Sequence, residues 1–560
     1  MSGRHCLGVH IGHDRGAALV SDGELVASIA EERLDRKKHS NSAALPMKSI
    51  EAVFNIAGIE AADLGAVGIC DTKVEIGGAV PLLRHELRDL LQVPHLDVIG
   101  VDHHDCHSWS TYCTFDGDDA LIVVADGAGE VIGDRIEAES VYVGFGAAIE
   151  LTHRRLQEFG LTQISRRNSY LLPYMNDIDR KKEISLGHKY EQFTYIVGFG
   201  EREAGKTMGL AAYGTPLYEI ATPALQDGQF SLTFQDGLAE VDRIWKASGQ
   251  PWHTFVERRK ADIAATGQKL LETYMVALLN ALNPTGAHRT LCAAGGVFLN
   301  CQMNSLILRE TKFDEMHVFP AAGDDGQCVG AAFYAYNQVF GEPKRGSAPL
   351  PYLGRRYCDS DIQYAVDKVG LRAQRLDNRE LTDLVAADLA AGKVVGLLRG
   401  RSELGPRALC HRSILADPRL PGMKDHLNHL KGRELFRPFA PVVTAENQAE
   451  YFEREHPSPY MLFATCLRPQ YRHCLPAVVH VDGSSRVQAV TQSQEPFVHA
   501  LLRCFERHSG FPILLNTSFN LAGDPIVESP HDAIATYRNS GIDVLVMENF
   551  YLDRKDIATG

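Results

Sequence analysis

Two histidines four residues apart are the first side chains in this sequence whose spacing could support metal chemistry. His103 and His107 follow the apolar stretch 96–101. If a helix begins there, both imidazoles project from one helix face and could share one metal ion. Histidines near a helix start are also common as ordinary solvent-exposed residues, so the pair alone does not establish a site.

Two aspartates strengthen the metal interpretation. Asp126 directly follows the apolar run Leu121–Ala125, and Asp324 follows residues 318–323, another strand-like end. Sheets of α/β proteins bind ligands outside the carboxyl ends of their strands, although an aspartate there can also be an N-cap or a turn residue. The two-His, two-Asp set predicts a site for iron(II), manganese or zinc. No glutamate follows the first histidine, so the HExxH protease pattern is absent.

Two glycine-containing segments could bring backbone amides close to a phosphate. They are 205–209 (GKTMG), with Gly205 and Gly209, and 293–296 (AAGG), with Gly295 and Gly296. We interpret both as turns, the second opening a helix after a strand. Backbone amides at such positions hold anions without basic side chains. Glycine also serves in simple tight turns, which remains the alternative.

A basic segment stands out near the C-terminal third of the chain. Residues 399–437 contain nine basic residues and four acidic ones, and the basic residues are Arg399, Arg401, Arg407, Arg412, Arg419, Lys424, Lys431, Arg433 and Arg437. They are interleaved with Gly405-Pro406 and with 437–441 (RPFAP), which favours shaped loops around a small anion over a solvated helix face. Asn516 and Ser518, after the apolar run 513–515, could complete this pocket or form an ordinary turn.

Composition limits the class of protein. The chain has 560 residues, of which 45% are hydrophobic and 23% charged, and its net charge is −14. We therefore expect a globular protein of about three to four folding units that does not bind nucleic acid. No apolar run approaches the ~18 residues that would span a bilayer, and charges interrupt residues 1–30. The twelve cysteines form no CxxC pair, which suits a reducing cytoplasm without membrane attachment.

Strands and helices alternate along the chain, which predicts an α/β fold. Asp22-Gly23 is a hairpin signal, Pro46 to Gly58 encloses a helix, and 262–282 has helical apolar spacing. The segment Gly341–Leu353, with three prolines and two glycines, predicts a linker. It divides the chain into 1–345, which we expect to contain two lobes, and 346–560.

These residues lie in a series of ordered motifs that together resemble the O-carbamoyltransferases of antibiotic and nodulation-factor biosynthesis, the tobramycin and cephamycin type. The similarity covers nearly the full length. Its motifs are His13-Asp14, 31–33 (EER), 103–107, 126–127, 205–214, 295–300 (GGVFLN), 323–326 (GDDG), 405–409 (GPRAL), 412–417 (RSILAD), 436–441 and 516–520 (NTSFN). Cys410-His411 departs from the Gly-Asn that we expect after GPRAL, which bears on the shape of the anion pocket.

The resemblance implies an actin-like (ASKHA, Kae1-like) two-lobed N-terminal domain over 1–345 and a YrdC-like α/β domain over 346–560. It also implies two half-reactions. In the second domain carbamoyl phosphate attacks the α-phosphate of ATP and gives carbamoyl adenylate and pyrophosphate. In the first domain a hydroxyl of a small natural-product or sugar-like acceptor takes the carbamoyl group, and AMP leaves.

Residue roles follow from the same resemblance. It implies that His103, His107, Asp126 and Asp324 hold a divalent metal, with Fe(II) ahead of Mn, Mg or Zn, and that His13 is the catalytic base. It further implies that Lys38 and the glycines Gly205, Gly209, Gly295 and Gly296 bind the nucleotide or adenylate. Carbamoyl phosphate and ATP would be bound by Arg407, Lys431, Arg437, Arg486, Asn516 and Ser518.

Two other functions use related folds. A fused tRNA threonylcarbamoyl-transfer enzyme would have the same domain types, but a chain of charge −14 without a basic tail is poorly suited to tRNA. A sugar kinase or ATPase of the actin-like superfamily would release ADP, whereas the carbamoyl route releases AMP and pyrophosphate. We expect a monomer or homodimer that acts on a small molecule.

Overall fold

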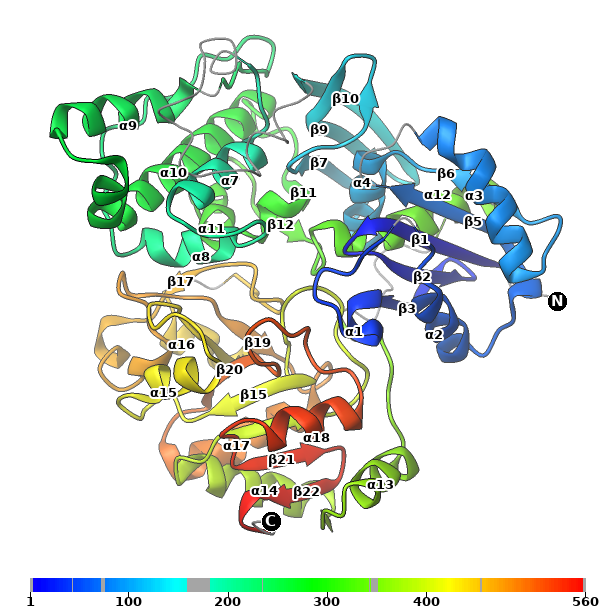
Figure 1. Cartoon of the computed structure of the whole chain (residues 1–560), viewed down its shortest axis with the longest axis vertical. Coiled ribbons are helices and arrows are strands. Elements are labelled where there is room, and N and C mark those ends of the chain that lie inside the picture. Colours follow the sequence, from blue (N-terminus) through cyan, green and yellow to red (C-terminus); the bar gives the residue numbers. More distant parts are fainter. Residues whose placement is uncertain are drawn as a thin grey trace. The chain divides into compact units, whose positions relative to one another are not determined.

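The computed structural model describes residues 4–42, 44–71, 76–158, 182–233, 235–341, 343, 351–453 and 456–556 (Figure 1). The chain forms two compact units, Met1–Ser28 with Asn41–Ala348, and Ile29–Ser40 with Pro349–Gly560. It therefore passes between the units three times. The predicted boundary between residues 345 and 346, within the predicted linker, lies outside the described residues.

The first unit contains two mixed sheets. One has the strand order β3-β2-β1-β5-β6, with β4 beside β1, and the other has the order β10-β9-β7-β11-β12, with β8 beside β9. In each sheet the central strand pairs antiparallel on one side and parallel on the other. The strands are β1 (His5–His13), β2 (Gly16–Ser21), β3 (Glu24–Ala30), β4 (Asn41–Ser42), β5 (Leu64–Asp71), β6 (Asp97–Gly100), β7 (Asp119–Ala125), β8 (Val131–Ile132), β9 (Arg135–Phe145), β10 (Ala148–Glu158), β11 (Thr290–Ala294) and β12 (Glu315–Val318).

Local sequence signals set several of these elements. Asp22 and Gly23 both have positive φ, as a two-residue hairpin turn requires, and Gly58 ends α2 in the left-handed conformation. The predicted helix 262–282 is longer, because α10 starts at Trp252 and continues through a kink at Arg259. The helices are α2 (Met47–Ala57), α3 (Ile76–Leu91), α4 (His103–Thr114), α7 (Leu186–Ile196), α8 (Ala204–Ala211), α9 (Gln235–Ser248), α10 (Trp252–Leu282), α11 (Cys301–Glu310) and α12 (Gln327–Phe340), with short 3₁₀ turns at Ala61–Asp63, Gly296–Leu299 and Asp324–Gly326.

Helix α12 approaches its neighbours unusually closely, because glycines lie at the contacts. A Cβ on Gly330 would lie 1.7 Å from the Cys106 carbonyl oxygen of α4, and one on Gly68 of β5 would lie 2.1 Å from the Ala331 carbonyl oxygen. Only glycine permits this backbone contact. The close packing fixes the start of α12 beside the start of α4.

The second unit is built on an eight-stranded mixed sheet of order β13-β22-β21-β14-β15-β20-β16-β19, with a separate two-stranded sheet, β17-β18. The strands are β13 (Gln374–Arg375), β14 (Val395–Leu398), β15 (Arg412–Ala416), β16 (Ala440–Thr444), β17 (Thr465–Cys466), β18 (Ser484–Ser485), β19 (Gln488–Val490), β20 (Ile513–Ser518), β21 (Val544–Met547) and β22 (Phe550–Asp553). The helices are α1 (Glu31–Asp35), α13 (Asp359–Lys368), α14 (Asn378–Ala390), α15 (Met423–Leu430), α16 (Gln448–Tyr451), α17 (Pro496–Ser509) and α18 (Pro530–Arg538), with 3₁₀ turns at Ala445–Asn447, Pro469–Tyr471, Pro476–Val478 and Arg554–Asp556.

An N-terminal segment, Ile29–Ser40 with α1, belongs to this second unit. Arg36 donates to the carbonyls of Ile526 (2.6 Å) and Pro525 (3.0 Å), and Arg33 donates to the Gly405 carbonyl (3.0 Å). Charge-assisted bonds to backbone oxygens hold the segment in place. Periodicity in the sequence gave no sign of this exchange between units.

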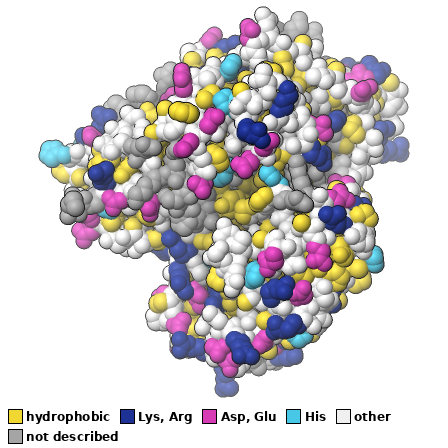
Figure 2. Space-filling model, turned by 180° about the vertical axis from the view of Figure 1, so that it is seen from behind, with side chains coloured by type: hydrophobic (Ala, Val, Ile, Leu, Met, Phe, Trp, Pro, Cys, Tyr) yellow, Lys and Arg dark blue, Asp and Glu magenta, His cyan; other side chains and the backbone are white. Residues whose placement is uncertain are grey.

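None of the helices in the described ranges is long and apolar enough to cross a bilayer. On the face drawn in Figure 2, basic and acidic side chains are interspersed.

A fully buried arginine holds together the centre of the second unit. Arg412, on β15, donates to the carbonyls of Arg399, Gly400, His411, Arg355 and Glu528 at 3.0–3.2 Å. Its guanidinium also lies 3.9 Å from the buried Glu528 carboxylate. Arg412 was among the basic residues from which we predicted an anion pocket, and the structure uses it instead to satisfy the backbone of the loops around β14 and β15.

We expect Arg412→Met to lower the free energy of unfolding of the second unit by about 3–5 kcal/mol, because Glu528 stays buried without its charge partner. Hydrogen exchange of the β15 and β20 amides under increasing urea would measure the change. The exposed Arg375, paired with Asp359 at the surface, provides the control, and Arg375→Met should cost about 0–1 kcal/mol. Equal effects of the two substitutions would contradict this role of Arg412.

Candidate metal and anion sites

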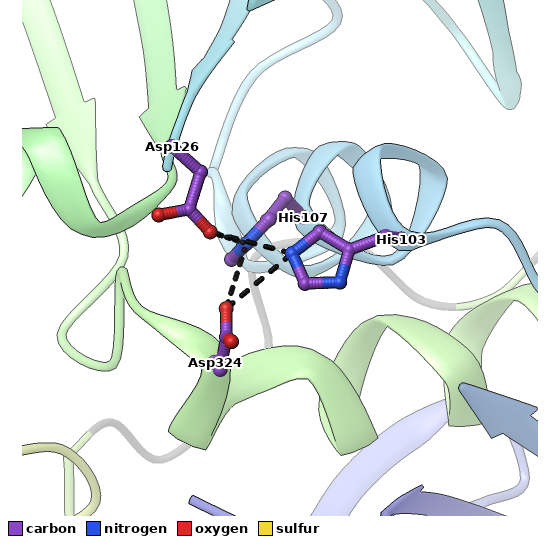
Figure 3. A group of neighbouring side chains, drawn as sticks. All are labelled: His103, His107, Asp126 and Asp324. Atoms are coloured by element: carbon purple, nitrogen blue, oxygen red, sulfur yellow. Dashed lines mark hydrogen bonds and ion pairs between the residues drawn. The ribbon is translucent and has the colours of Figure 1, made fainter. Parts of the chain in front are cut away.

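Four side chains that the sequence singled out meet in the first unit. His103 and His107 lie on the first two turns of α4, Asp126 directly follows β7, and Asp324 begins the 3₁₀ turn before α12. One ligand atom from each lies within 4.8 Å of the others (Figure 3). We call these four residues the donor cluster.

The donor cluster has the geometry of a shared ligand set. Asp126 Oδ2 lies 3.3 Å from His103 Nε2 and 3.4 Å from His107 Nε2. Asp324 Oδ1 lies 3.4 Å and 3.5 Å from the same two nitrogens. Two imidazole nitrogens and two carboxylate oxygens suit a borderline divalent ion. The residues therefore fit the predicted metal.

Burial makes the charges of the donor cluster interdependent. Burial alone would lower the pKa of His103, but the Asp324 carboxylate and hydrogen bonds to both aspartates outweigh it and raise that pKa well above its ordinary value. Burial and repulsion from Asp324 would raise the pKa of Asp126, yet hydrogen bonds from both imidazoles hold it below its ordinary range. The cluster thus needs positive charge to balance its two carboxylates.

Backbone amides hold the other oxygen of Asp126. Asp126 Oδ1 accepts hydrogen bonds from the amides of Gly127 (2.8 Å) and Gly296 (3.2 Å). Gly295 precedes this contact with a φ of 98°, and a Cβ there would lie 2.2 Å from the Ala125 carbonyl oxygen. Gly295 and Gly296 were predicted to bind a nucleotide through a helix-opening turn. The turn that follows is a 3₁₀ turn rather than an α-helix, and the Gly296 amide bonds to a member of the donor cluster; the nucleotide contact stays a prediction.

The other glycine segment is not a turn. Gly205 and Gly209 lie within helix α8, so the predicted glycine turn is wrong. The residues between and after them, including Lys206, Met208 and Leu210, are strong helix formers, and α8 packs on α7 and α10. An interior amide such as that of Gly209 donates along the helix.

His13, at the end of β1, lies beside the donor cluster. Its Nε2 is 3.1 Å from Asp324 Oδ2, and its Nδ1 is 3.3 Å from Asp14 Oδ2. The ring is partly exposed, at 21%. An imidazole bracketed by two carboxylates is oriented, and it can exchange protons with solvent or with a ligand.

In the second unit, the predicted Lys431 and Ser518 are in contact. Lys431 Nζ donates to Ser518 O and Oγ, to Asn520 O (2.9 Å) and to Asn520 Oδ1 (3.0 Å). Burial, together with repulsion from Arg433, Arg437 and Lys38, lowers the pKa of Lys431. Asn520 was not among the predicted site residues.

Further cations gather around Lys431. We define Lys38, Lys431, Arg433, Arg437 and Arg486 as the cation cluster. Burial and the neighbouring Arg437 and Arg486 lower the pKa of Arg433 to about 9. Lys38 comes from the N-terminal segment, so the structure places this predicted phosphate contact with the second unit. Like charges this close raise the free energy of the protein unless an anion binds among them.

Arg433 belongs to the basic segment but was not among the residues predicted to bind the anion. Its Nε donates to Asn428 Oδ1 (2.6 Å), and its guanidinium lies 4.2 Å from the Phe439 ring centre. Asn428 also donates to the carbonyl oxygen of Arg437 (3.1 Å), so one buried amide holds the side chain of Arg433 and the backbone of Arg437. The spacing Lys431-x-Arg433, on either side of Gly432, was the available signal.

Asn516 lies on β20 rather than after it, and its amide is firmly oriented. It donates to Gln488 Oε1 (2.8 Å), to Ala408 O (3.2 Å) and to Cys410 Sγ (3.4 Å). Ala408 follows the predicted Arg407, and Gln488 lies two residues after the predicted Arg486. Sequence neighbours of the predicted Arg407 and Arg486 therefore meet the predicted Asn516 on β20.

The departure at Cys410-His411 has a clear structural setting. Cys410 is fully buried with a φ of 82°, a conformation that favours glycine, and its thiol contacts Asn516. His411 stacks on Tyr352, with ring centres 3.6 Å apart, and its Nε2 lies 3.0 Å from Glu495 Oε1. His411 thus holds the loop before β15 through Tyr352 and Glu495, while the Cys410 thiol contacts the amide of Asn516.

Several of the nine basic residues of segment 399–437 have structural roles, contrary to the prediction that the whole basic segment surrounds an anion. Arg399 donates to the Glu548 carbonyl, Arg401 to the Leu353 carbonyl, and Arg419 to the Asp417 carboxylate. Arginine is suited to such buried bonding because its fork satisfies several acceptors. Part of the positive balance of 399–437 therefore serves to hold the backbone of the second unit.

Known proteins match this chain over almost its entire length. The family model described as carbamoyltransferase N-terminus matches residues 79–333, and the one described as carbamoyltransferase C-terminus matches residues 386–554. Nodulation protein NolNO of Sinorhizobium fredii is 32% identical, and the alignment covers 97% of this chain and 79% of NolNO. The 3'-hydroxymethylcephem-O-carbamoyltransferase of Amycolatopsis lactamdurans is 32% identical over 63% of this chain and 65% of its own.

Solved structures resemble the chain only loosely. Full-length HypF, in its phosphate- and nucleotide-bound form, is 13% identical and superposes with a TM-score of 0.42 over 60% of this chain and 56% of HypF. The assignment therefore depends on the sequence relatives and on both family models. On these matches, which confirm the resemblance stated from the motifs, the chain belongs to the carbamoyltransferase family and is a carbamoyltransferase enzyme.

Proposed function

We propose that this enzyme is an ATP-dependent O-carbamoyltransferase that works through carbamoyl adenylate. The observation that carries the proposal is the presence of two chemically different clusters in separate units. The cation cluster of the second unit would form the adenylate, and the donor cluster of the first unit would serve the transfer step. The duplicated strand order of the first unit supports an actin-like fold, and we propose a YrdC-like fold for the second.

Direct attack of carbamoyl phosphate on ATP, as the resemblance implied, would leave one phosphoryl group without a destination, so we propose that carbamate is formed first. Carbamoyl adenylate keeps the carbamoyl group and one phosphorus atom, so the phosphoryl group of carbamoyl phosphate passes to water and leaves as inorganic phosphate. The carbamate oxygen then attacks the α-phosphorus of ATP, and the bond to the β-phosphate breaks to release pyrophosphate. The cation cluster, with Arg407, Asn516 and Ser518, would hold these mutually repelling anions together.

In the second half-reaction, the acceptor hydroxyl attacks the carbamoyl carbon and the bond to AMP breaks. His13, oriented by Asp14 and adjacent to Asp324, would accept the hydroxyl proton. His103, His107, Asp126 and Asp324 would hold a divalent ion, for which we propose Fe(II). Such an ion, when bound, supplies positive charge that anchors phosphate and polarises a carbonyl.

The acceptor class follows from the relatives. A nodulation protein and a cephem O-carbamoyltransferase are similar over most of the chain. We propose a small natural-product or sugar-like alcohol, and a screen of candidate alcohols with carbamoyl phosphate and ATP would identify it by the mass gain of one carbamoyl unit. Formation of AMP and pyrophosphate, rather than ADP, distinguishes this enzyme from a kinase.

We expect His103→Ala to reduce carbamoyl transfer by about 100-fold or more. The substitution removes one of the four residues proposed to hold the ion whose charge would stabilise the transition state of transfer. Pyrophosphate release that depends on carbamoyl phosphate should stay within about twofold of wild type. The control is His317→Ala, which removes a partly buried histidine of the first unit that is bonded to Thr114. Loss of both half-reactions in folded His103→Ala protein would refute the division between units.

Arg437→Ala should do the reverse. We expect it to slow carbamoyl-phosphate-dependent release of phosphate and pyrophosphate by roughly 100-fold, because a partly buried charge contact to the bound anions is lost. Supplied carbamoyl adenylate should still be used by the first unit. Arg379→Ala, a surface change on α14, is the control, and normal pyrophosphate release by Arg437→Ala would overturn the assignment.

A further inference from the structure

A buried glutamine on β10 uses its whole side chain to connect three segments of the first unit. Gln157 is 1% exposed. Its Nε2 donates to the carbonyls of Gly127 (2.7 Å) and Glu137 (3.3 Å). Its Oε1 accepts from the Ser185 amide (3.0 Å) and lies 2.9 Å from His188 Nδ1. Both donor hydrogens of the amide are therefore used, and its oxygen accepts from the Ser185 amide and, in the tautomer that carries the proton on Nδ1, from His188.

The carbonyl that Gln157 holds belongs to the residue after a member of the donor cluster. Gly127 donates its own amide to Asp126 Oδ1, which leaves Asp126 Oδ2 facing the two imidazoles. Gly127 therefore links Gln157 to Asp126 through one residue. Because glycine restricts its own backbone little, external bonds must fix the Gly127 peptide.

The first turn of α7 lies against the same loop. Ser185, the N-cap of α7, donates from Oγ to the Gly127 carbonyl (2.6 Å), and a Cβ on Gly187 would lie 2.6 Å from the Asp126 carbonyl oxygen. The Gly127 carbonyl thus accepts two hydrogen bonds, one from β10 and one from α7. The loop after β7 is held from both sides.

Helix α7 has its own attachment that does not involve Gln157. The Leu186 amide donates to Glu139 Oε1 (2.7 Å), and Arg155 Nε donates to Glu139 Oε2 (2.6 Å). Arg155 also donates to the Ile184 carbonyl (2.9 Å). A change at Gln157 should therefore leave α7 in place and act on the loop.

We propose that Gln157 is a positioning residue for Asp126. Its amide fixes the Gly127 peptide, and with it the distance from Asp126 Oδ2 to His103 and His107. The inference rests on the proposed function, because it assumes that the donor cluster binds a divalent ion. A carboxamide is required here, since a carboxylate of the same shape would bring acceptor oxygens against the carbonyls of Gly127 and Glu137.

The test measures Co(II) binding by the full-length protein, with both calorimetry and the visible absorption spectrum of the bound ion. Gln157→Glu should weaken Co(II) binding by about 10–100-fold and alter the spectrum at saturation, as expected when a supporting contact to a ligand is lost. Carbamoyl-phosphate-dependent pyrophosphate release, which we assign to the second unit, should be unchanged. A purely structural role would not change the saturated spectrum.

Asn283→Asp is the matched control. Asn283, at the end of α10, donates to the His288 carbonyl (2.7 Å) and accepts from the His288 amide (3.2 Å), so it undergoes the same chemical change far along the chain from the loop. Its Co(II) affinity should stay within twofold of wild type. Equal weakening in Asn283→Asp and Gln157→Glu would overturn the positioning role.

The remaining outcomes are also decisive. Wild-type affinity and an unchanged spectrum in Gln157→Glu would refute the inference while leaving the proposed metal site intact. Wild-type protein that transfers carbamoyl groups but binds no Co(II), Mn(II) or Fe(II) would refute the metal site and the inference together. If Gln157→Glu does not fold, Ser185→Ala decides, because it removes the second donor to Gly127, and unchanged Co(II) binding there would overturn the proposal.

Discussion

The close approach of α12 to α4 is the constraint on which the donor cluster depends. With no Cβ at Gly330, the two helices pack with backbone against backbone, and Asp324, in the 3₁₀ turn before α12, is brought opposite the imidazoles of α4. Any larger residue at position 330 would have to push α12 away. The two carboxylates would then no longer share the same pair of nitrogens, and the balance of buried charge would be lost.

The buried and crowded charges of the two units have different kinds of partner. In the first, two carboxylates are balanced by imidazoles and by backbone amides, which leaves positions suited to a cation. In the second, lysine and arginine side chains lie close together, and the neutral amides of Asn428 and Asn520 accept hydrogen bonds from Arg433 and Lys431. Neutral amides hold the cations without cancelling their charge, which preserves their attraction for an anion.

Sequence patterns predicted the parts of this arrangement that are local. The spacing of His103 and His107, the position of Asp126 after an apolar run and the α/β alternation are all properties of short segments. The patterns failed where distant segments decide the outcome. Helix α8 runs through its glycines while packed on α7 and α10. Gln157 lies thirty residues after the loop that it contacts and belongs to no motif. Arg412 donates to backbone carbonyls that only the folded sheet brings together.

The placement of residues 29–40 in the second unit has a consequence for biosynthesis. These residues leave the ribosome several hundred residues before most of their partners. They therefore lack their native contacts until residues 349 onward have emerged. Late closure of such a distant contact slows folding. A fragment that starts at residue 349 would therefore lack one of its own structural pieces, including Lys38, and would be an incomplete domain from the moment of its synthesis.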